Sequence, residues 1–89
     1  MLESAPHSLD AEKMVLGKVV TYPNLFEEVF AIVPEPNMFY DTAHRILWDI
    51  ITMMYGMKED INYVTIVNNI PKKYEKDLDA YYITGLIDA

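Results

Sequence analysis

The sequence predicts an all-α domain, built as a compact bundle of about five to six short helices. Three observations support this prediction. Apolar residues recur at three- and four-residue spacing, residues that cap helices stand before several of these runs, and prolines separate one run from the next. The chain of 89 residues is 52% hydrophobic, which supplies enough apolar surface for one core and argues against disorder. We therefore expect residues 1–89 to form a single helical domain.

The first predicted helix covers residues 9–20, with Ser8 as its N-cap. Its apolar residues follow helical spacing: Leu9, Ala11, Met14, Val15, Leu16, Val19 and Val20. Gly17 lies inside this run, where glycine costs about 1 kcal/mol relative to alanine. We therefore expect another helix to approach closely at Gly17.

The second predicted helix is short and covers residues 25–33, and Pro34 stops it. An apolar segment at residues 38–40 follows and must dock on the core. Asp41 is a suitable N-cap for the longest and most clearly amphipathic helix, which is expected to reach about Tyr55. Its apolar stripe consists of Ala43, Ile46, Leu47, Ile50, Ile51 and Met54, with His44, Trp48 and Tyr55 on the flank. We expect Gly56 to cap its C-terminus.

The two remaining predicted helices lie on either side of Pro71. Asn62 caps the first of them, whose β-branched residues would also suit a strand, although the cap and the pair Asn68-Asn69 favour a helix. The last helix is expected to run from near Asp77 to the end of the chain. Because no stop signal follows it, we expect the chain to be a piece of a longer protein.

Charge and composition exclude several functions. The formal net charge is −7, so the chain repels a phosphate backbone and we expect no direct DNA binding. It has no cysteine and therefore neither a disulfide framework nor a thiolate metal site. No apolar run approaches the ~20 residues of a membrane span, and the acidic N-terminus does not resemble an export signal. We expect no membrane association.

No catalytic motif is present in the sequence. Three glycines, at positions 17, 56 and 85, cannot form a phosphate-binding loop, and His7 and His44 are too far apart for a helical zinc motif. The many carboxylates are typical of solvated helix faces. We expect no catalytic residue, cofactor or metal in this chain.

Two features favour an interaction module. His44-Arg45 opens the central helix beside Trp48; either His44 packs at the core edge while Arg45 pairs with an acid, or the pair contacts another protein. Seven tyrosines exceed what so small a core can bury, and Tyr and Trp are favoured at protein interfaces. The candidate interface residues are His44, Trp48, Tyr55, Tyr81 and Tyr82.

Four local patterns occur in an order that resembles a known family. Residues 6–17, Pro-His-Ser-Leu-Asp-Ala-Glu-Lys-Met-Val-Leu-Gly, resemble the P-x-S-x-E-A-E-x-x-V-L-G opening of the N-terminal domain of DnaB-type replicative DNA helicases. Residues 39–48 resemble its F-Y-x-x-x-H-R-x-I-F segment, residues 61–67 its V-D-x-x-T-V stretch, and residues 81–86 its Y-L-x-x-L. Asp10, Trp48 and Asn62 replace the family's Glu, Phe and Asp, and Leu78-Asp79-Ala80 stand where Gly-Gly is common.

The resemblance implies a specific role. In this family the N-terminal domain is an all-α head followed by a helical hairpin, and a RecA-like domain holds the ATPase motor. The heads pair into a trimer-of-dimers collar on the hexameric ring, and the collar binds primase. The chain would then be the non-catalytic head, with helicase subunits and primase as partners, in the bacterial cytoplasm at the nucleoid and replisome. ATP and Mg²⁺ would serve the parent enzyme, an ATP-dependent DNA helicase.

Two alternatives remain open at this stage. A free-standing helical adaptor or loader of the same fold could bind the helicase or primase. An unrelated helical DNA-binding domain is disfavoured by the net charge of −7.

Overall fold

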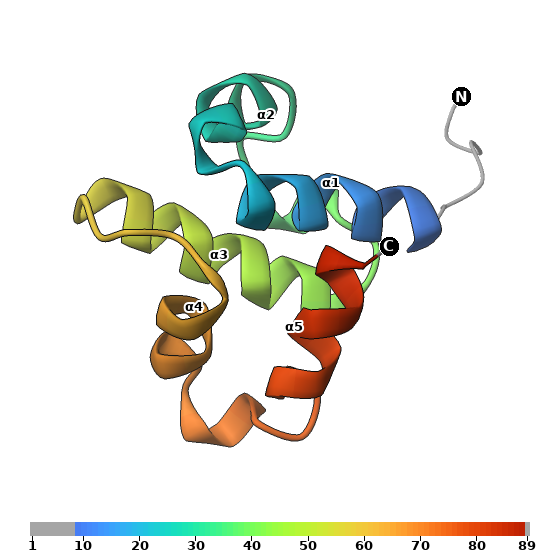
Figure 1. Cartoon of the computed structure of the whole chain (residues 1–89). Helices are drawn as coiled ribbons and strands as arrows, with labels where there is room; N and C mark the ends of the chain where they lie inside the picture. The colour runs from blue at the N-terminus through green and yellow to red at the C-terminus, as the bar shows by residue number, and fades with distance from the viewer. Residues whose placement is uncertain (1–8, 89) are drawn as a thin grey trace.

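The computed structural model describes residues 9–88, which form five α-helices and three short 3-10 turns with no strand among them. Figure 1 shows the arrangement: α1 and α3 run side by side, α2 lies on one side of them, and α4 and α5 lie on the other. The predicted all-α class is confirmed for this part of the chain.

Helix α1 covers Leu9–Thr21 and therefore matches its expected range, whereas the predicted cap Ser8 lies outside the described residues. The 3-10 turn η1 (Pro23–Leu25) leads directly into α2 (Phe26–Ile32), which ends before Pro34 as the sequence predicts. After the turn η2 (Pro36–Met38), only Phe39 of the short apolar segment enters the core, at 4% exposed, whereas Met38 and Tyr40 are 58% and 54% exposed.

The central helix α3 covers Thr42–Gly56 and begins as predicted. The Asp41 carboxylate accepts hydrogen bonds from the Ala43 and His44 N–H groups and so caps the first turn.

At the C-terminal end of α3 the predicted cap, Gly56, is wrong, because Gly56 is the last helical residue. Lys58 instead adopts the left-handed conformation, with φ of 60°. The Lys58 N–H donates to the Tyr55 carbonyl and the Glu59 N–H to the Met54 carbonyl, both at 3.0 Å, which is a Schellman motif. A lysine therefore holds the position that usually belongs to glycine.

We predict that Lys58→Gly raises the free energy of unfolding by about 1 kcal/mol, because a left-handed residue with a Cβ costs roughly 1–2 kcal/mol. The larger conformational entropy of glycine in the unfolded chain cancels part of this gain. Gly56→Ala is expected to add about 0.5–1 kcal/mol more, since a Cβ there meets nothing within 4 Å and alanine favours the helix. Urea denaturation of the two single variants and the double variant measures both effects. Lys58→Ala, which keeps the Cβ, is the control and should gain little; a destabilised Lys58→Gly variant would contradict the prediction.

Helix α4 (Tyr63–Asn69) confirms the helical interpretation of this segment. The Asn62 side chain accepts from the Thr65 N–H and the Thr65 hydroxyl accepts from the Asn62 N–H, which forms a capping box. Helix α5 (Ala80–Ile87) begins later than predicted, because Asp79 caps it by accepting from the Tyr82 N–H. The preceding residues form the turn η3 (Lys72–Tyr74) and bring Leu78, 1% exposed, into the core ahead of the helix.

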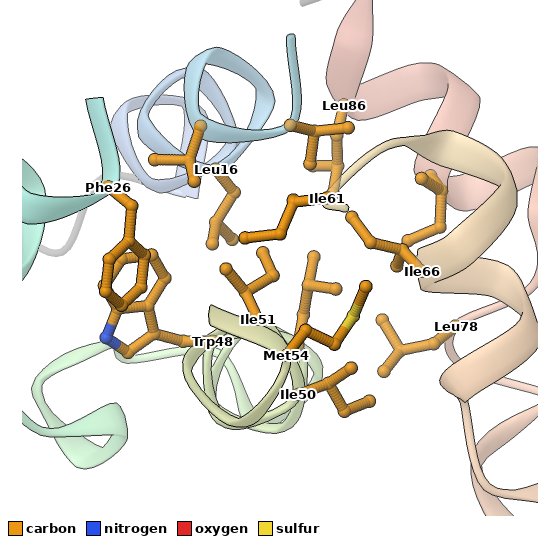
Figure 2. Packing of buried hydrophobic residues seen from close by; sticks show 14 of the residues in the cluster. Leu16, Phe26, Trp48, Ile50, Ile51, Met54, Ile61, Ile66, Leu78 and Leu86 are labelled. Atoms are coloured by element: carbon orange, nitrogen blue, oxygen red, sulfur yellow. The ribbon is translucent and has the colours of Figure 1, made fainter. Parts of the chain in front are cut away.

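The core surrounds the buried face of α3. Figure 2 shows Trp48, Ile51 and Met54 of this helix facing side chains from the other elements, with Phe26 against Trp48 and Leu78 beside Met54. Gly17 allows α1 to meet α5 backbone to backbone, since a Cβ built there would lie 2.9 Å from the Leu86 carbonyl carbon and closer still to its oxygen. The close approach expected at this glycine is confirmed. None of the helices described here has the length and apolar character needed to cross a membrane.

Candidate functional site

A buried polar network lies where α1, α3 and α5 meet. His44 of α3 has no exposed surface, and its two ring nitrogens reach two different helices. Its Nδ1 is 2.7 Å from Oε1 of Glu12 on α1, and its Nε2 is 2.6 Å from the hydroxyl of Tyr82 on α5. Because a carboxylate can only accept, the proton belongs on Nδ1, and the Tyr82 hydroxyl then donates to Nε2. Both ring nitrogens therefore have a hydrogen-bond partner.

Glu12 connects this network to the segment before α3. Its second oxygen accepts from the Tyr40 N–H at 2.6 Å, and its first also accepts from the Asp41 N–H at 3.3 Å. The Glu12 side chain is 15% exposed: its bonds to Asp41 and His44 are partly buried, whereas its bond to the Tyr40 N–H lies at the surface. One carboxylate therefore fixes α1 to the α3 N-terminus through three donors, and His44 extends the connection to α5.

The order Glu, His, hydroxyl resembles the geometry of a catalytic triad, but its electrostatics do not suit nucleophilic catalysis. Burial raises the pKa of the Tyr82 hydroxyl, and the charges of Asp41 and Glu12 raise this pKa further. An activated nucleophile needs the opposite shift. The hydrogen bonds that connect α1, α3 and α5 through His44 support a structural role for the network.

We predict a pH dependence from the raised pKa of Tyr82. In the unfolded chain the hydroxyl ionises near its ordinary value of 10.0, whereas the folded protein holds the proton to higher pH. This contribution to stability is therefore complete below pH 10 and is lost as pH rises through the folded pKa. Urea unfolding measured from pH 8 to pH 11 should show a falling free energy of unfolding, and Tyr82→Phe should reduce the slope. An unchanged slope in Tyr82→Phe would contradict the prediction.

Two of the five residues proposed for an interface are buried. His44 and Trp48 each have 0% exposed surface, because other elements cover the flank of the α3 stripe on which they lie, so in this structure their side chains are closed to another protein. The Trp48 indole N–H donates to the Val33 carbonyl at 3.0 Å, and Phe26 stacks beside the ring. The Arg45 Nε donates to the Phe39 carbonyl at 2.6 Å, so its partner is a backbone carbonyl where an acid was expected. The packing interpretation of His44 is confirmed.

The three tyrosines of the candidate set reach the surface at two separate places. Tyr81 is 88% exposed and lies with the half-buried Tyr82 along a shallow hollow of about 160 Å³, which Lys13, Gly85 and Leu86 complete. Tyr55 is 38% exposed and lies at the far end of α3, where its ring stacks on Phe26 and its hydroxyl donates to Glu27. This hydrogen bond raises the pKa of the Tyr55 hydroxyl. The α5 surface therefore presents the more exposed aromatic side chain.

Sequence reasoning missed Glu12 and a larger groove beside Tyr55. Glu12 stands four residues before the buried Leu16, so it lies on the core face of α1, and this position was the available signal. The groove measures about 580 Å³ and is lined by η1, the end of α3 and the loop after it. Chain segments distant in sequence form it, so no local pattern marks it. Residues 9–88 contain no group of three metal-ligating side chains.

These features define a class of protein: a small helical domain stabilised by a Glu-His-Tyr network and presenting tyrosines to solvent. Residues 4–89 match the family described as "DnaB-like helicase N terminal domain". The chain belongs to this family, which confirms the resemblance drawn from its four motifs.

A solved structure agrees with this assignment. The chain is similar to the crystal structure of the N-terminal domain of DnaB helicase from Mycobacterium tuberculosis, with 28% sequence identity and a TM-score of 0.85. The match covers 93% of this chain and 61% of the other, so this chain spans less than two thirds of the length of the solved one. Among curated proteins no sequence matches the chain.

Proposed function

We propose that this domain is the non-catalytic head of a replicative DNA helicase, where it contributes to the collar of the hexamer and binds primase during DNA replication. Membership of the DnaB-like N-terminal domain family supports the proposal. In this proposal ATP and Mg²⁺ serve the motor domain of the parent helicase, which unwinds DNA in the cytoplasm at the replisome. The head works through protein contacts, as its net charge of −7 favours.

The observation that carries the primase contact is the exposed aromatic surface on α5. Tyr81 is 88% exposed, a large exposure for an aromatic side chain, and it borders a hollow next to Tyr82 and Lys13. Tyrosine contributes a large contact area at low entropic cost, which is why it dominates many binding interfaces. The ring of Tyr82 is fixed from beneath by His44, so this part of the surface is already ordered before binding.

We predict that Tyr81→Ala weakens binding of the cognate primase's C-terminal domain by about tenfold or more, the effect of a typical aromatic hot spot. Isothermal titration calorimetry with the purified chain measures it. The substitution should leave the fold intact, because the Tyr81 side chain makes no buried contact that the core needs.

Tyr22→Ala is the matched control. Tyr22 is also an exposed tyrosine, at 56%, but it follows the C-terminal end of α1 and lines a different hollow from Tyr81. We expect it to change primase affinity less than about twofold. Equal losses from the two substitutions would contradict a contact at α5, and absence of any binding between the chain and primase would contradict the proposed function itself.

A further inference from the structure

The groove beside Tyr55 is separate from the α5 surface. It lies at the C-terminal end of α3, and Figure 1 shows this end on the opposite side of the molecule from α5. Its volume of about 580 Å³ falls within the range of ~300–1,000 Å³ that is usual for ligand pockets. Pro23, the Tyr55 ring and Ile61 supply apolar walls, and Asn24 adds an amide at the rim. The groove can therefore accept apolar and polar groups together.

Hydrogen bonds and stacking hold the walls of the groove in place. The Tyr55 ring stacks on Phe26 with centroids 4.2 Å apart, and its hydroxyl donates to Glu27. The Glu59 carboxylate accepts from the Asn69 amide at 3.0 Å. The Asp60 carbonyl accepts from the Thr65 hydroxyl at 2.6 Å. A site whose walls are fixed before binding loses less conformational entropy when it is occupied.

The charges around the groove favour a cation. Glu59 and Asp60 line it, Glu27 lies beside it on the Tyr55 hydroxyl, and Lys58 is the one base among the lining residues of the described chain. Three carboxylates thus stand against one ammonium group. The overall charge of −7 adds a long-range attraction for basic partners.

We propose that this groove is a second docking site, which binds an arginine-bearing apolar peptide segment of a partner protein. One face of the Tyr55 ring packs on Phe26. The residue is 38% exposed and lines the groove, where a planar guanidinium can stack on the ring. The same guanidinium can pair with a carboxylate through two parallel hydrogen bonds, which an ammonium group cannot do. Apolar residues on either side of the arginine then cover Pro23 and Ile61.

The experiment is a nuclear magnetic resonance titration of the ¹⁵N-labelled chain. The probe is the peptide acetyl-Ala-Leu-Arg-Leu-Ala-amide, compared with peptides carrying lysine or the neutral isostere citrulline in place of arginine. We expect the backbone amides of Asn24 and residues 58–61 to shift, with those of α5 unchanged. The lysine peptide should bind at least about threefold more weakly and the citrulline peptide at least about tenfold more weakly.

Two double variants with the same change in net charge distinguish binding at the groove from attraction to the overall charge of the domain. Glu59→Gln with Asp60→Asn removes two groove charges and keeps an oxygen that can accept from Asn69, and it should weaken the arginine peptide about fivefold or more. Glu75→Gln with Asp77→Asn, two exposed acids outside the groove, should change binding less than about twofold. Lys58→Gly removes the opposing charge and should tighten binding about twofold.

Several results would overturn the proposal. Equal weakening by the two double variants would mean that the peptide follows net charge alone. Equal affinity for the citrulline or lysine peptide would remove the role of the guanidinium. Groove shifts that appear when the unlabelled chain is added without peptide would show that a second copy is the occupant. None of these results bears on the α5 surface, so the primase proposal stands or falls separately.

Discussion

Replacing Gly17 by alanine is expected to lower the free energy of unfolding by about 2–3 kcal/mol, although alanine is the better helix former. The new Cβ would lie 2.9 Å from the Leu86 carbonyl carbon and nearer still to the carbonyl oxygen. Both atoms belong to the backbone of α5, so no side-chain rotation can relieve the contact. The two helices must separate, and their contact is the most extensive between any two elements of the described fold.

The cost of that separation decides the sign of the effect. Alanine gains about 1 kcal/mol over glycine inside a helix, whereas overpacking against a fixed backbone costs typically ~1–3 kcal/mol and occasionally more. Moving α1 from α5 also disturbs the packing of Leu16 and Leu86, both fully or almost fully buried. A domain of this size loses roughly 4–8 °C in melting temperature per kcal/mol, so thermal unfolding followed by circular dichroism should show a drop of about 10–20 °C.

Gly85→Ala is the matched control for this prediction. Gly85 is also a helical glycine, but it is exposed and a Cβ there meets nothing within 4 Å. Alanine should therefore raise the free energy of unfolding by about 0.5–1 kcal/mol at this position. Opposite signs at Gly17 and Gly85 are the expected result. A stabilised Gly17→Ala variant would show that α1 and α5 do not pack as closely as described.

The helices were predictable because their signals are local. Asp41 and Asn62 cap helices in the structure as the sequence indicates, and apolar spacing located α1 and α3 within one or two residues. The two boundary errors have different causes. At the start of α5 a local signal was overlooked, because Asp79 caps the helix by accepting from the Tyr82 N–H. At the end of α3 a lysine takes the left-handed position that glycine usually holds, so residue preference alone does not locate the end of the helix.

The candidate site was less predictable than the helices. Helical spacing gives the direction of a side chain but not the number of elements that cover it. His44 and Trp48 were therefore expected on the flank of the apolar stripe of α3, and the structure shows both completely buried. Val33 and Phe26 come from another part of the chain to cover Trp48, and Tyr82 covers His44. Helical spacing does account for Tyr81, because a residue two positions before the buried Ile83 lies on the opposite, exposed face of α5.

Glu12→Gln is expected to lower the free energy of unfolding by about 2–4 kcal/mol, because it removes a charged acceptor from a buried network. Three donors converge on the carboxylate: the His44 ring and the N–H groups of Tyr40 and Asp41. Glutamine has one acceptor oxygen. When this oxygen takes the place of Oε1, the amide N–H groups face the Tyr40 N–H, which is itself a donor. At least one donor then loses its charged partner, and the cost is greatest where the loss falls on the ring of the buried His44.

Chemical denaturation measures the loss, and Glu28→Gln provides the control. Glu28 is exposed on α2, so the same substitution there should change the free energy of unfolding by less than about 0.5 kcal/mol.

A double-mutant cycle tests whether the network acts as one unit. Tyr82→Phe removes the hydroxyl from the other side of His44, and a ring already misplaced by Glu12→Gln has less left to lose. The sum of the two single losses in free energy of unfolding should therefore exceed the loss in the double variant by about 0.5 kcal/mol or more. Strict additivity would mean that Glu12 and Tyr82 each contact His44 independently, and that the helices α1 and α5 are not coupled through the imidazole.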